Sequence, residues 1–488
     1  MGVRIKDISE KLSRFFSSDA FIVLSAGIVF FGWFFRLWVP FLCVFAALVT
    51  AALFLTDTNR PMILFLLLFT FGISESRHGL APYWRLLFLF VPLFAGMICQ
   101  AVRYRKKRPA FKPREMGKHH FFLLLFTLPF LFGGLGRTAE SPTVRFLAFL
   151  LILLAGGTYT LFIATNAGRE DGHALPDHVL KGLVAVGVVI SLELLVYYFR
   201  LGSKDLVLRA IADKQHELGW GGPNIIATIY MLTIPAAFYF CTKRSPWTPL
   251  FTFFAVGQYL LLLSTGSRGC IFVVTFALPA LLLYVMHVAE DKRAFAFSLC
   301  GIYFAAFIIL LFSADKVIPA LANRLAMGLD ANGRLDFEYP EAWAAFRQYP
   351  LFGVGWDYKM EGSYIPLWYH STVLQVSAAM GIFGLLFYAL WTFFRYRDFY
   401  LARKDMRVRF LFLSALFFDA YCMIDPGFFS PSFFMMLLMV QLAVEVAAKK
   451  EGSPPHPKRG IMQKAFLCVM MGNSLFAARA LQPCEGVR

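Results

Sequence analysis

The chain has 488 residues, of which 59% are hydrophobic, 17% aromatic and 16% charged. Soluble globular proteins average about 45–50% apolar and about 25% charged residues, and disordered chains are more polar still, so both classes are excluded. A polytopic membrane protein fits, because the length allows a dozen or more helices of about 20 residues each. The net charge of +17, from 47 Lys and Arg against 30 Asp and Glu, must be located along the chain before it can be interpreted.

Apolar runs along the chain predict membrane-spanning helices, because lipid offers no water to satisfy the backbone of an open strand. The segment at 61–73 is the shortest of them, so we expect an all-α polytopic membrane protein with about 12–14 transmembrane helices. In chain order, the fourteen runs cover residues 20–35, 37–55, 61–73, 82–102, 119–133, 144–165, 179–199, 223–240, 247–264, 268–286, 294–312, 370–394, 408–425 and 428–447.

Basic residues in the loops predict the orientation, because cytoplasmic loops carry an excess of Lys and Arg. With the N-terminus inside, 32 of the 47 basic residues are cytoplasmic and 15 are outside. The connector at 103–118 alone has eight. The inner loops then carry a net charge of +17 and the outer face +2, so the excess faces anionic membrane lipids. A nucleic-acid partner is not needed to explain it.

The predicted topology divides the chain at its longest loop. Residues 1–312 form the first set of transmembrane helices, 313–369 a large extracytoplasmic loop and 370–447 the C-terminal transmembrane helices. Loops this long are usually functional or disordered. Helical spacing is present at 333–348, where Pro340 is expected to break the helix. Residues 448–488 form a basic cytoplasmic tail, and its apolar stretch at 461–481 predicts an interfacial helix rather than a fifteenth span.

One histidine at the rim of the membrane is a candidate general base. His370 ends the large loop where a span begins, and the topology places it outside with only His78 and His216. A histidine at this depth is commonly just an interfacial residue. Because its unperturbed pKa lies near neutrality, His370 could instead take a proton from a hydroxyl group.

The turn at 264–269, Ser-Thr-Gly-Ser-Arg-Gly, is a candidate phosphate site. Arg268 stands where the next span starts outside, flanked by Ser267 and Gly269. A hydroxyl, a guanidinium and the N-terminus of a helix together suit a phosphate. The alternative is a tight turn whose arginine reaches the membrane surface.

The large loop adds two further cations, Arg324 and Arg334. Each alone is a weak signal, since Asp330, Asp336 and Glu338 could pair with them. Asp336 and Glu338 could also hold a divalent ion, although they fit the surface of a helix better. Three arginines and a histidine on one side of the membrane could hold a diphosphate and deprotonate a hydroxyl.

Two acids inside the predicted spans support a different function. Glu193 and Asp419 lie near mid-membrane, and such acids often mark proton or ion pathways. They leave open a transporter or flippase for lipid-linked sugars. A non-enzymatic assembly scaffold is the second alternative. Neither explains the outward histidine and arginines, and no nucleotide-binding loop is present in the sequence.

Over residues 215–440 the chain resembles the O-antigen ligase and O-antigen polymerase superfamily of bacterial envelope enzymes. The N-terminal half matches only as generic spans, and Ser371 departs from the Asn that many members have after the histidine. The resemblance depends on five segments in order: the run at 219–227 with Asn224, the turn at 264–269, Gly333-Arg334 followed by Trp343, the run at 349–356, and His370-Ser371-Thr372.

The resemblance implies an all-α membrane enzyme of the C-type glycosyltransferase kind, without metal or cofactor. Members take a glycan from a polyprenyl-diphosphate carrier and transfer it to an acceptor hydroxyl on the outer face of the membrane. The acceptor can be a glycan, a lipid or a protein. Carried over by position, His370 is the base and the diphosphate ligands are Arg268, Arg324 and Arg334. Supporting roles fall to Ser267, Gly269, Asn224 and Trp343.

Overall fold

The fold is built from helices. The computed structural model describes residues 2–68, 88–107, 117–135, 142–166, 174–214, 218, 221–311, 334–356, 369–425, 427–429 and 431–450. Within these residues there is no β-strand, and one isolated bridge joins Leu218 to Gly221. The prediction of an all-α protein is therefore confirmed. The proposed interfacial helix at 461–481 lies outside the described residues.

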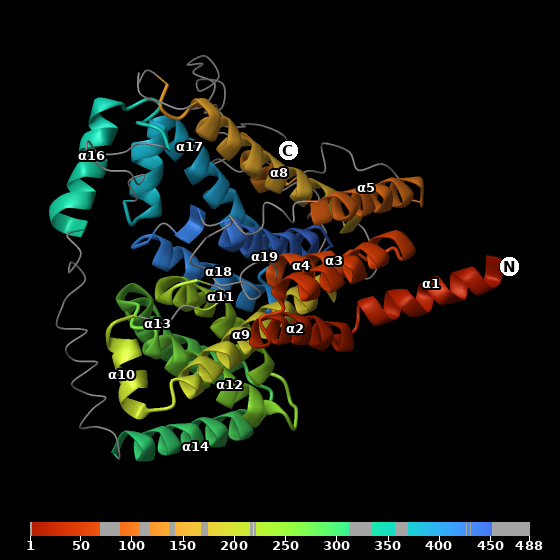
Figure 1. Cartoon of the computed structure of the whole chain (residues 1–488), viewed down its shortest axis with the longest axis vertical. Helices are drawn as coiled ribbons and strands as arrows, with labels where there is room; N and C mark the ends of the chain where they lie inside the picture. Colours follow the sequence, from red (N-terminus) through yellow and green to blue (C-terminus); the bar gives the residue numbers. More distant parts are fainter. Residues whose placement is uncertain are drawn as a thin grey trace, which may run out of the picture.

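The described part of residues 2–214 forms ten helices (Figure 1). They are α1 (Gly2–Phe16), α2 (Asp19–Phe34), α3 (Trp38–Leu55), α4 (Arg60–Leu68), α5 (Phe90–Lys107), α6 (Lys118–Leu125), α7 (Leu128–Phe132), α8 (Pro142–Asn166), α9 (Leu175–Arg200) and α10 (Lys204–Ala212).

From residue 223 onward the chain continues with mostly longer helices and two short turns. Three predicted site residues stand at the starts of elements: Arg268 opens α13, Arg334 opens η5, and His370 lies two residues before α17. The elements are α11 (Pro223–Cys241), α12 (Thr248–Ser264), α13 (Arg268–Val288), α14 (Lys292–Leu311), the π-helical turn η5 (Arg334–Glu338), α16 (Tyr339–Gln348), α17 (Thr372–Leu401), α18 (Met406–Cys422), the 3₁₀ turn η6 (Gly427–Phe429) and α19 (Pro431–Lys450).

Several helices are suited to a membrane by length and composition. Within the described residues, α3, α9, α11, α13 and α17 are long and apolar enough to cross one, and the bent pair formed by 9–16 and α2 could be a sixth span. Each of the fourteen predicted apolar runs overlaps a helix. The larger number of 12–14 spans remains a prediction.

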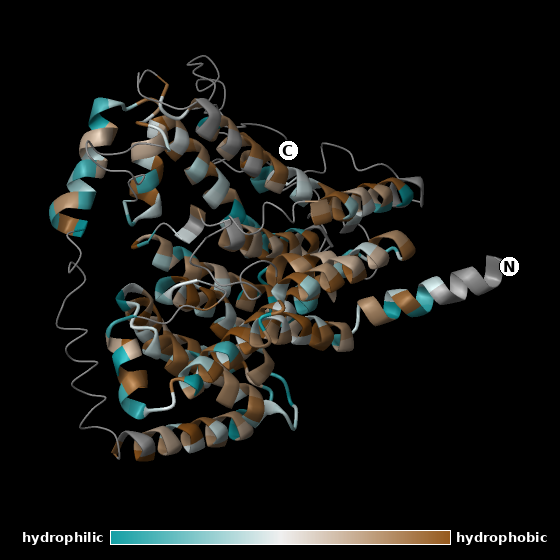
Figure 2. Ribbon diagram, in the orientation of Figure 1, coloured by the Kyte–Doolittle hydropathy of each residue, from teal (hydrophilic) through white to brown (hydrophobic). Residues whose placement is uncertain are grey.

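The outer surfaces of α13 and α14 are apolar. Phe276 and Leu283 on α13 are each 72% exposed, and Phe297 on α14 is 75% exposed. Figure 2 shows hydrophobic residues along α14, whereas hydrophilic residues gather on α10 and α16. In water such surface would cost about 25 cal/mol per Å² of exposed apolar area, but in lipid it is at no disadvantage. These faces therefore fit contact with lipid chains.

Two proline-containing segments differ from the sequence-based expectation. The run at 119–133 divides into α6 and α7, and Pro129 stands in the first turn of α7. Pro340 does not break the loop helix but lies in the first turn of α16. Proline is tolerated there because the first N–H groups of a helix have no partner inside the helix. The helix predicted over 333–348 is otherwise confirmed, with η5 as its first turn.

The interior of the protein is centred on α11. This helix packs against α9, α12 and α18. In its most apolar stretch of 18 residues, 83% is buried. Pro223 opens α11, so the helix begins at a defined point beside the Arg268 turn. The packing of α11 thereby holds one wall of the candidate site in place.

A backbone interlock joins the loop segment at 350–355 to a break in α17. At Gly381 the helix leaves helical geometry, with φ +64° and ψ −159°. Gly353, with φ +67°, approaches the break so closely that a Cβ would lie 2.4 Å from the carbonyl oxygen of Ala378. A Cβ on Gly381 would lie 2.4 Å from the carbonyl oxygen of Leu351. Only glycine fits at both positions.

Hydrogen bonds complete this interlock. The broken helix exposes backbone groups that would otherwise be unsatisfied, and the loop segment supplies partners for them. Two loop N–H groups donate to carbonyl oxygens of α17: Val354 to Ala378 (2.7 Å) and Gly355 to Ala379 (3.0 Å). Two N–H groups of α17 donate to carbonyl oxygens of the loop: Ile382 to Pro350 (2.8 Å) and Phe383 to Leu351 (3.3 Å). The loop and α17 therefore behave as one unit.

A buried polar cluster joins four helices away from the interlock. His119 on α6 contacts Asp398 on α17 through Nδ1. Its Nε2 lies 2.7 Å from the hydroxyl of Tyr159 on α8 and 3.1 Å from a carboxylate oxygen of Glu445 on α19. The hydroxyl of Tyr159 donates to Glu445 at 2.7 Å. Because buried polar groups are costly unless paired, this cluster favours one arrangement of α6, α8, α17 and α19.

Replacing Gly353 by Ala is expected to destabilise the protein by about 2 kcal/mol or more, since the Cβ would meet backbone in a left-handed conformation. The readout is the midpoint of thermal unfolding in detergent. Gly301→Ala on α14 is the matched control, because its Cβ would meet nothing within 4 Å. An unfolding midpoint for Gly353→Ala equal to that of Gly301→Ala would show that the interlock adds no stability.

Candidate functional site

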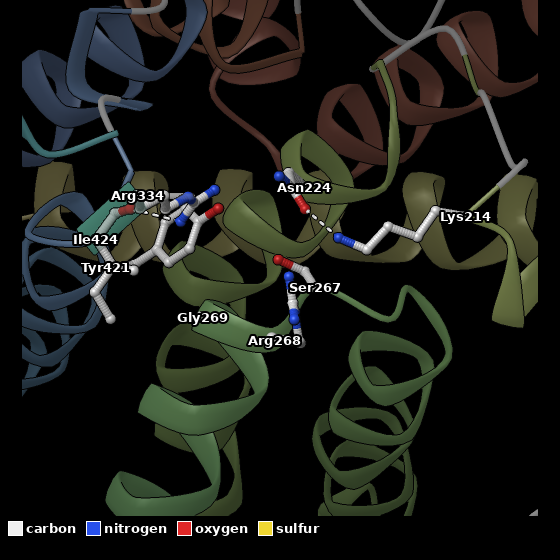
Figure 3. Close-up of a pocket in the computed structure, with 8 residues that line it drawn as sticks. All are labelled: Lys214, Asn224, Ser267, Arg268, Gly269, Arg334, Tyr421 and Ile424. Atoms are coloured by element: carbon white, nitrogen blue, oxygen red, sulfur yellow. Dashed lines mark hydrogen bonds between the residues drawn. The ribbon is translucent and has the colours of Figure 1, made fainter. Parts of the chain in front are cut away.

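A small cavity collects residues from segments far apart in the chain (Figure 3). Its volume is about 30 Å³, room for about two water-sized groups such as the oxygens of a phosphate. Three of the side chains are cationic, and no Asp or Glu is among the described residues that line it. The lining consists of Lys214, Asn224, Ser267, Arg268, Gly269, Arg334, Tyr421 and Ile424.

Two helix N-termini open onto this cavity. Asn224 is in the first turn of α11, and Arg268 and Gly269 begin α13 after Ser267. Neither Gly222 nor Ser267, the two capping residues, makes a side-chain capping hydrogen bond. The first N–H groups of a helix and its dipole favour a negatively charged ligand, and here they reinforce the three cations.

Gly269 lets α18 approach the start of α13. A Cβ at this position would lie 3.0 Å from the Tyr421 ring. Any larger residue would push the Tyr421 ring away from its place in the wall of the cavity. The glycine that follows the arginine in the sequence motif thus has a packing role.

Arg334 connects the cavity to His370. Its NH1 donates to the carbonyl oxygen of Ile424 at 3.0 Å, and its NH2 lies 3.2 Å from Nδ1 of His370. Arg334 Nε is buried and has no hydrogen-bond partner among the described residues. The guanidinium therefore retains a donor for a ligand. Its side chain is only 14% exposed, so water screens its charge weakly.

Two carboxylates stand close to His370. Asp425 Oδ2 lies 3.6 Å from Nδ1 of His370 and 4.0 Å from NH2 of Arg334. Glu338 Oε1 lies 3.7 Å from Nε2 of His370. The hydroxyl of Tyr339 donates to the carbonyl oxygen of His370 at 3.2 Å. Negative charges at this distance stabilise an imidazolium, which is what a histidine becomes after it accepts a proton.

Backbone strain concentrates around the site. Among the described residues, the non-glycine residues with positive φ are Arg36, Lys214 and His370, at 59°, 51° and 40°. Left-handed conformations cost about 1–2 kcal/mol for residues with a Cβ and cluster at functional sites. Lys214 lines the cavity and His370 contacts Arg334, so two of the three residues belong to this region.

Most of the predicted site residues meet in space. Arg268, Arg334, Ser267, Gly269 and Asn224 all line the cavity, and His370 adjoins it through Arg334.

Two predicted residues do not join this group. Trp343 on α16 is 51% exposed, and its ring packs near Phe346 at 5.5 Å between centroids. It lies on the outer side of the loop helix and does not line the cavity. Arg324 lies outside the described residues, so its role stays a prediction.

The structure adds residues that sequence reasoning missed. Lys214 and Tyr421 line the cavity, and Asp425 lies near His370. Glu338 was expected as a partner for an arginine, as charge on a helix surface or as a ligand of a divalent ion, and not beside the histidine. The available signal for Asp425 was an acid at the end of an apolar run, on the same predicted side as His370. Nothing in the sequence separated Lys214 from other loop lysines.

The two acids within predicted spans lie elsewhere. Glu193 on α9 is fully buried. Asp419 on α18 accepts hydrogen bonds from Arg395 and from the hydroxyl of Tyr396, both on α17. Arg395 is also fully buried and stacks over the ring of Trp391. This pairing neutralises the charge of Asp419 within the protein through its Oδ2, so its burial does not by itself require an ion pathway.

Comparison with known proteins bears on the central part of the chain. A family model described as O-Antigen ligase matches residues 251–389, a little over a quarter of the chain. The matched segment contains Arg268, Arg334 and His370, whereas Lys214 and Asp425 lie outside it. A search of curated proteins found no match. Over this central segment the chain is similar to the O-antigen ligase family.

Proposed function

We propose that the protein is a membrane glycan ligase or polymerase that transfers a saccharide from a polyprenyl-diphosphate carrier to an acceptor hydroxyl. The observation that carries this proposal is the 3.2 Å contact between His370 and Arg334, an arginine that also lines the cationic cavity with Arg268. One group can thereby hold phosphate while its neighbour accepts a proton. The acceptor is a glycan, a lipid or a protein side chain.

The reaction needs a base and a place for negative charge. The acceptor oxygen forms a bond to the anomeric carbon while the bond from that carbon to the phosphate oxygen breaks. The electron pair of the broken bond stays on the leaving diphosphate, and the hydroxyl proton passes to His370. Arg334 and Arg268 stabilise the charge that develops on the phosphate, because a guanidinium binds phosphate oxygens in pairs and stays charged.

In the structure, Arg334 lies against Nδ1 of His370. A guanidinium can only donate, so this nitrogen accepts in the neutral ring. A phosphate in the cavity would attract Arg334 and leave Nδ1 available to the acceptor hydroxyl. Asp425, 3.6 Å from the same nitrogen, then stabilises the protonated ring. Binding of the donor and activation of the base are therefore coupled through one arginine.

The proposed location is the cell membrane, the inner or cytoplasmic membrane in a two-membrane envelope, with the chain crossing it several times. The distribution of Lys and Arg supports an active site on the extracytoplasmic side. On that side the donor glycan is joined to its acceptor within the cell envelope. Exposed apolar surfaces such as that of α14 allow a polyprenyl chain to approach from the lipid.

Replacing His370 by Ala is expected to lower kcat about 10²- to 10⁴-fold, the usual contribution of a general base. The measurement is transfer of labelled glycan from polyprenyl diphosphate in proteoliposomes. His287→Ala is the control, because His287 is exposed in the last turn of α13, at the opposite end from Arg268. Activity that survives in His370→Ala would remove His370 as the base.

Arg268→Lys is expected to lower kcat about tenfold or more, since lysine keeps the charge but cannot bind two phosphate oxygens in a planar fork. The same transfer assay measures it. Arg293→Lys, at an exposed position in the first turn of α14, makes the identical change away from the site. A full rate for Arg268→Lys would mean that a point charge suffices.

Asp425→Asn is expected to lower kcat about tenfold while the KM for the donor stays near that of the wild type, because Asp425 acts on the protonated base. Asp336→Asn is the control, since Asp336 is an exposed acid in η5 close to the same site. Equal kinetics for the two variants would show that Asp425 does not support His370.

A further inference from the structure

We propose that Lys214 binds the lipid-side phosphate of the donor and so sets the direction in which the diphosphate lies. The inference rests on the proposed function and adds to it a binding residue and the direction in which the diphosphate lies. The sugar-side phosphate lies at Arg334, next to His370. The polyprenyl-bearing phosphate lies at the other end of the cavity, at Lys214.

The first step is the position of Lys214. It follows α10 and reaches the cavity, where its Nζ donates to Oδ1 of Asn224 at 3.2 Å. Figure 3 shows Lys214 and Arg334 on opposite sides of the cavity, with Ser267 and Arg268 between them. Three cationic side chains therefore follow one another across the cavity. A diphosphate has two linked phosphate groups and suits such a row better than a single phosphate does.

The second step is the position of the base. His370 lies 3.2 Å from Arg334, and it does not line the cavity. The acceptor hydroxyl must meet both the base and the anomeric carbon, so the sugar lies at the Arg334 end. The phosphate bonded to that sugar is then the one nearest Arg334. The remaining phosphate, which carries the lipid, extends toward Lys214.

The third step is the division of labour between the cations. When the sugar leaves, the electron pair of the broken bond stays on the sugar-side phosphate. Negative charge therefore grows on the phosphate that Arg334 and Arg268 hold. The lipid-side phosphate keeps nearly the same charge throughout. A cation that holds it stabilises ground state and transition state alike, which changes KM rather than kcat. Lys214 is thus a binding and positioning residue.

The backbone around Lys214 fits this role. With φ +51°, Lys214 takes a left-handed conformation that a residue with a Cβ rarely adopts. The hydrogen bond to Asn224 connects it to the first turn of α11. Asn224, singled out in the sequence as part of the motif at 219–227, is therefore the residue that aims the lysine.

The test is equilibrium binding of undecaprenyl diphosphate and undecaprenyl monophosphate to the full chain in detergent. The monophosphate has only the lipid-side phosphate. Lys214→Met is expected to weaken binding of both ligands about tenfold or more, the effect of losing one charge-assisted contact. Arg334→Met is expected to weaken binding of the diphosphate only. Lys214→Arg should bind within about threefold of the wild type.

Two controls separate binding from folding. Lys204→Met removes an exposed lysine at the start of α10 and should leave both affinities unchanged. Thermal unfolding midpoints of all variants should match, since none of these changes is expected to alter the fold. In the transfer assay, Lys214→Met should raise the KM for the donor about tenfold, with kcat close to the wild-type value.

The outcomes are distinct. If Lys214→Met behaves like Lys204→Met, Lys214 is not a ligand, while the proposed function stands. If Lys214→Met weakens binding of the diphosphate only and Arg334→Met weakens binding of both ligands, the diphosphate lies in the opposite direction. A wild-type protein that binds neither ligand would overturn the proposed function together with this inference.

Discussion

The close approach of two glycines, Gly353 and Gly381, is the constraint on which the site depends. At the break in α17 the chain leaves room for backbone but none for a Cβ, and the segment at 350–355 supplies the hydrogen bonds that the helix lacks. This segment follows α16, which continues from η5 and Arg334. His370 stands just before the start of α17, the helix that contains the break. One backbone contact therefore locates the cation and the base relative to each other.

The charges around His370 are arranged unevenly, with acids beside the ring and cations in the neighbouring cavity. Asp425 and Glu338 provide negative charge beside the ring, and Arg334 connects it to the cationic cavity. In the proposed mechanism a donor diphosphate would be drawn to the cations, whereas the proton of the acceptor hydroxyl would go to His370, beside the acids. Since these side chains are mostly buried, their interactions are stronger than the same charges would be in water. The leaving diphosphate and the proton would thus go to different groups.

The sequence was sufficient for much of this arrangement. Each hydrophobic run overlaps a helix, because lipid-facing and buried helices must be apolar over most of their length. The amphipathic helices α1 and α10 had no such run, and the run at 119–133 overlaps both α6 and α7. Arg268 and His370 could be singled out because each lies where a loop meets an apolar run, and Arg334 because it is a cation of the large loop and follows Gly333 in the family motif. Lys214 and Asp425 could not, since their positions depend on how α10, α11 and α18 pack against one another. Trp343 was chosen for its place in the family motif, but the face of α16 that it occupies is decided by packing.

The excess of positive charge has two different physical origins. Basic residues near the predicted cytoplasmic surface are solvated, and their number matters more than their positions, because they act on anionic lipid through a screened field. The cations of the cavity act over contact distances, where a shift of one side chain removes an interaction. Few residues of the second kind are needed, and each has a specific partner, as Arg334 has Ile424 and Lys214 has Asn224. Net charge thus reports topology, whereas chemistry depends on the few cations that the helix starts hold in place.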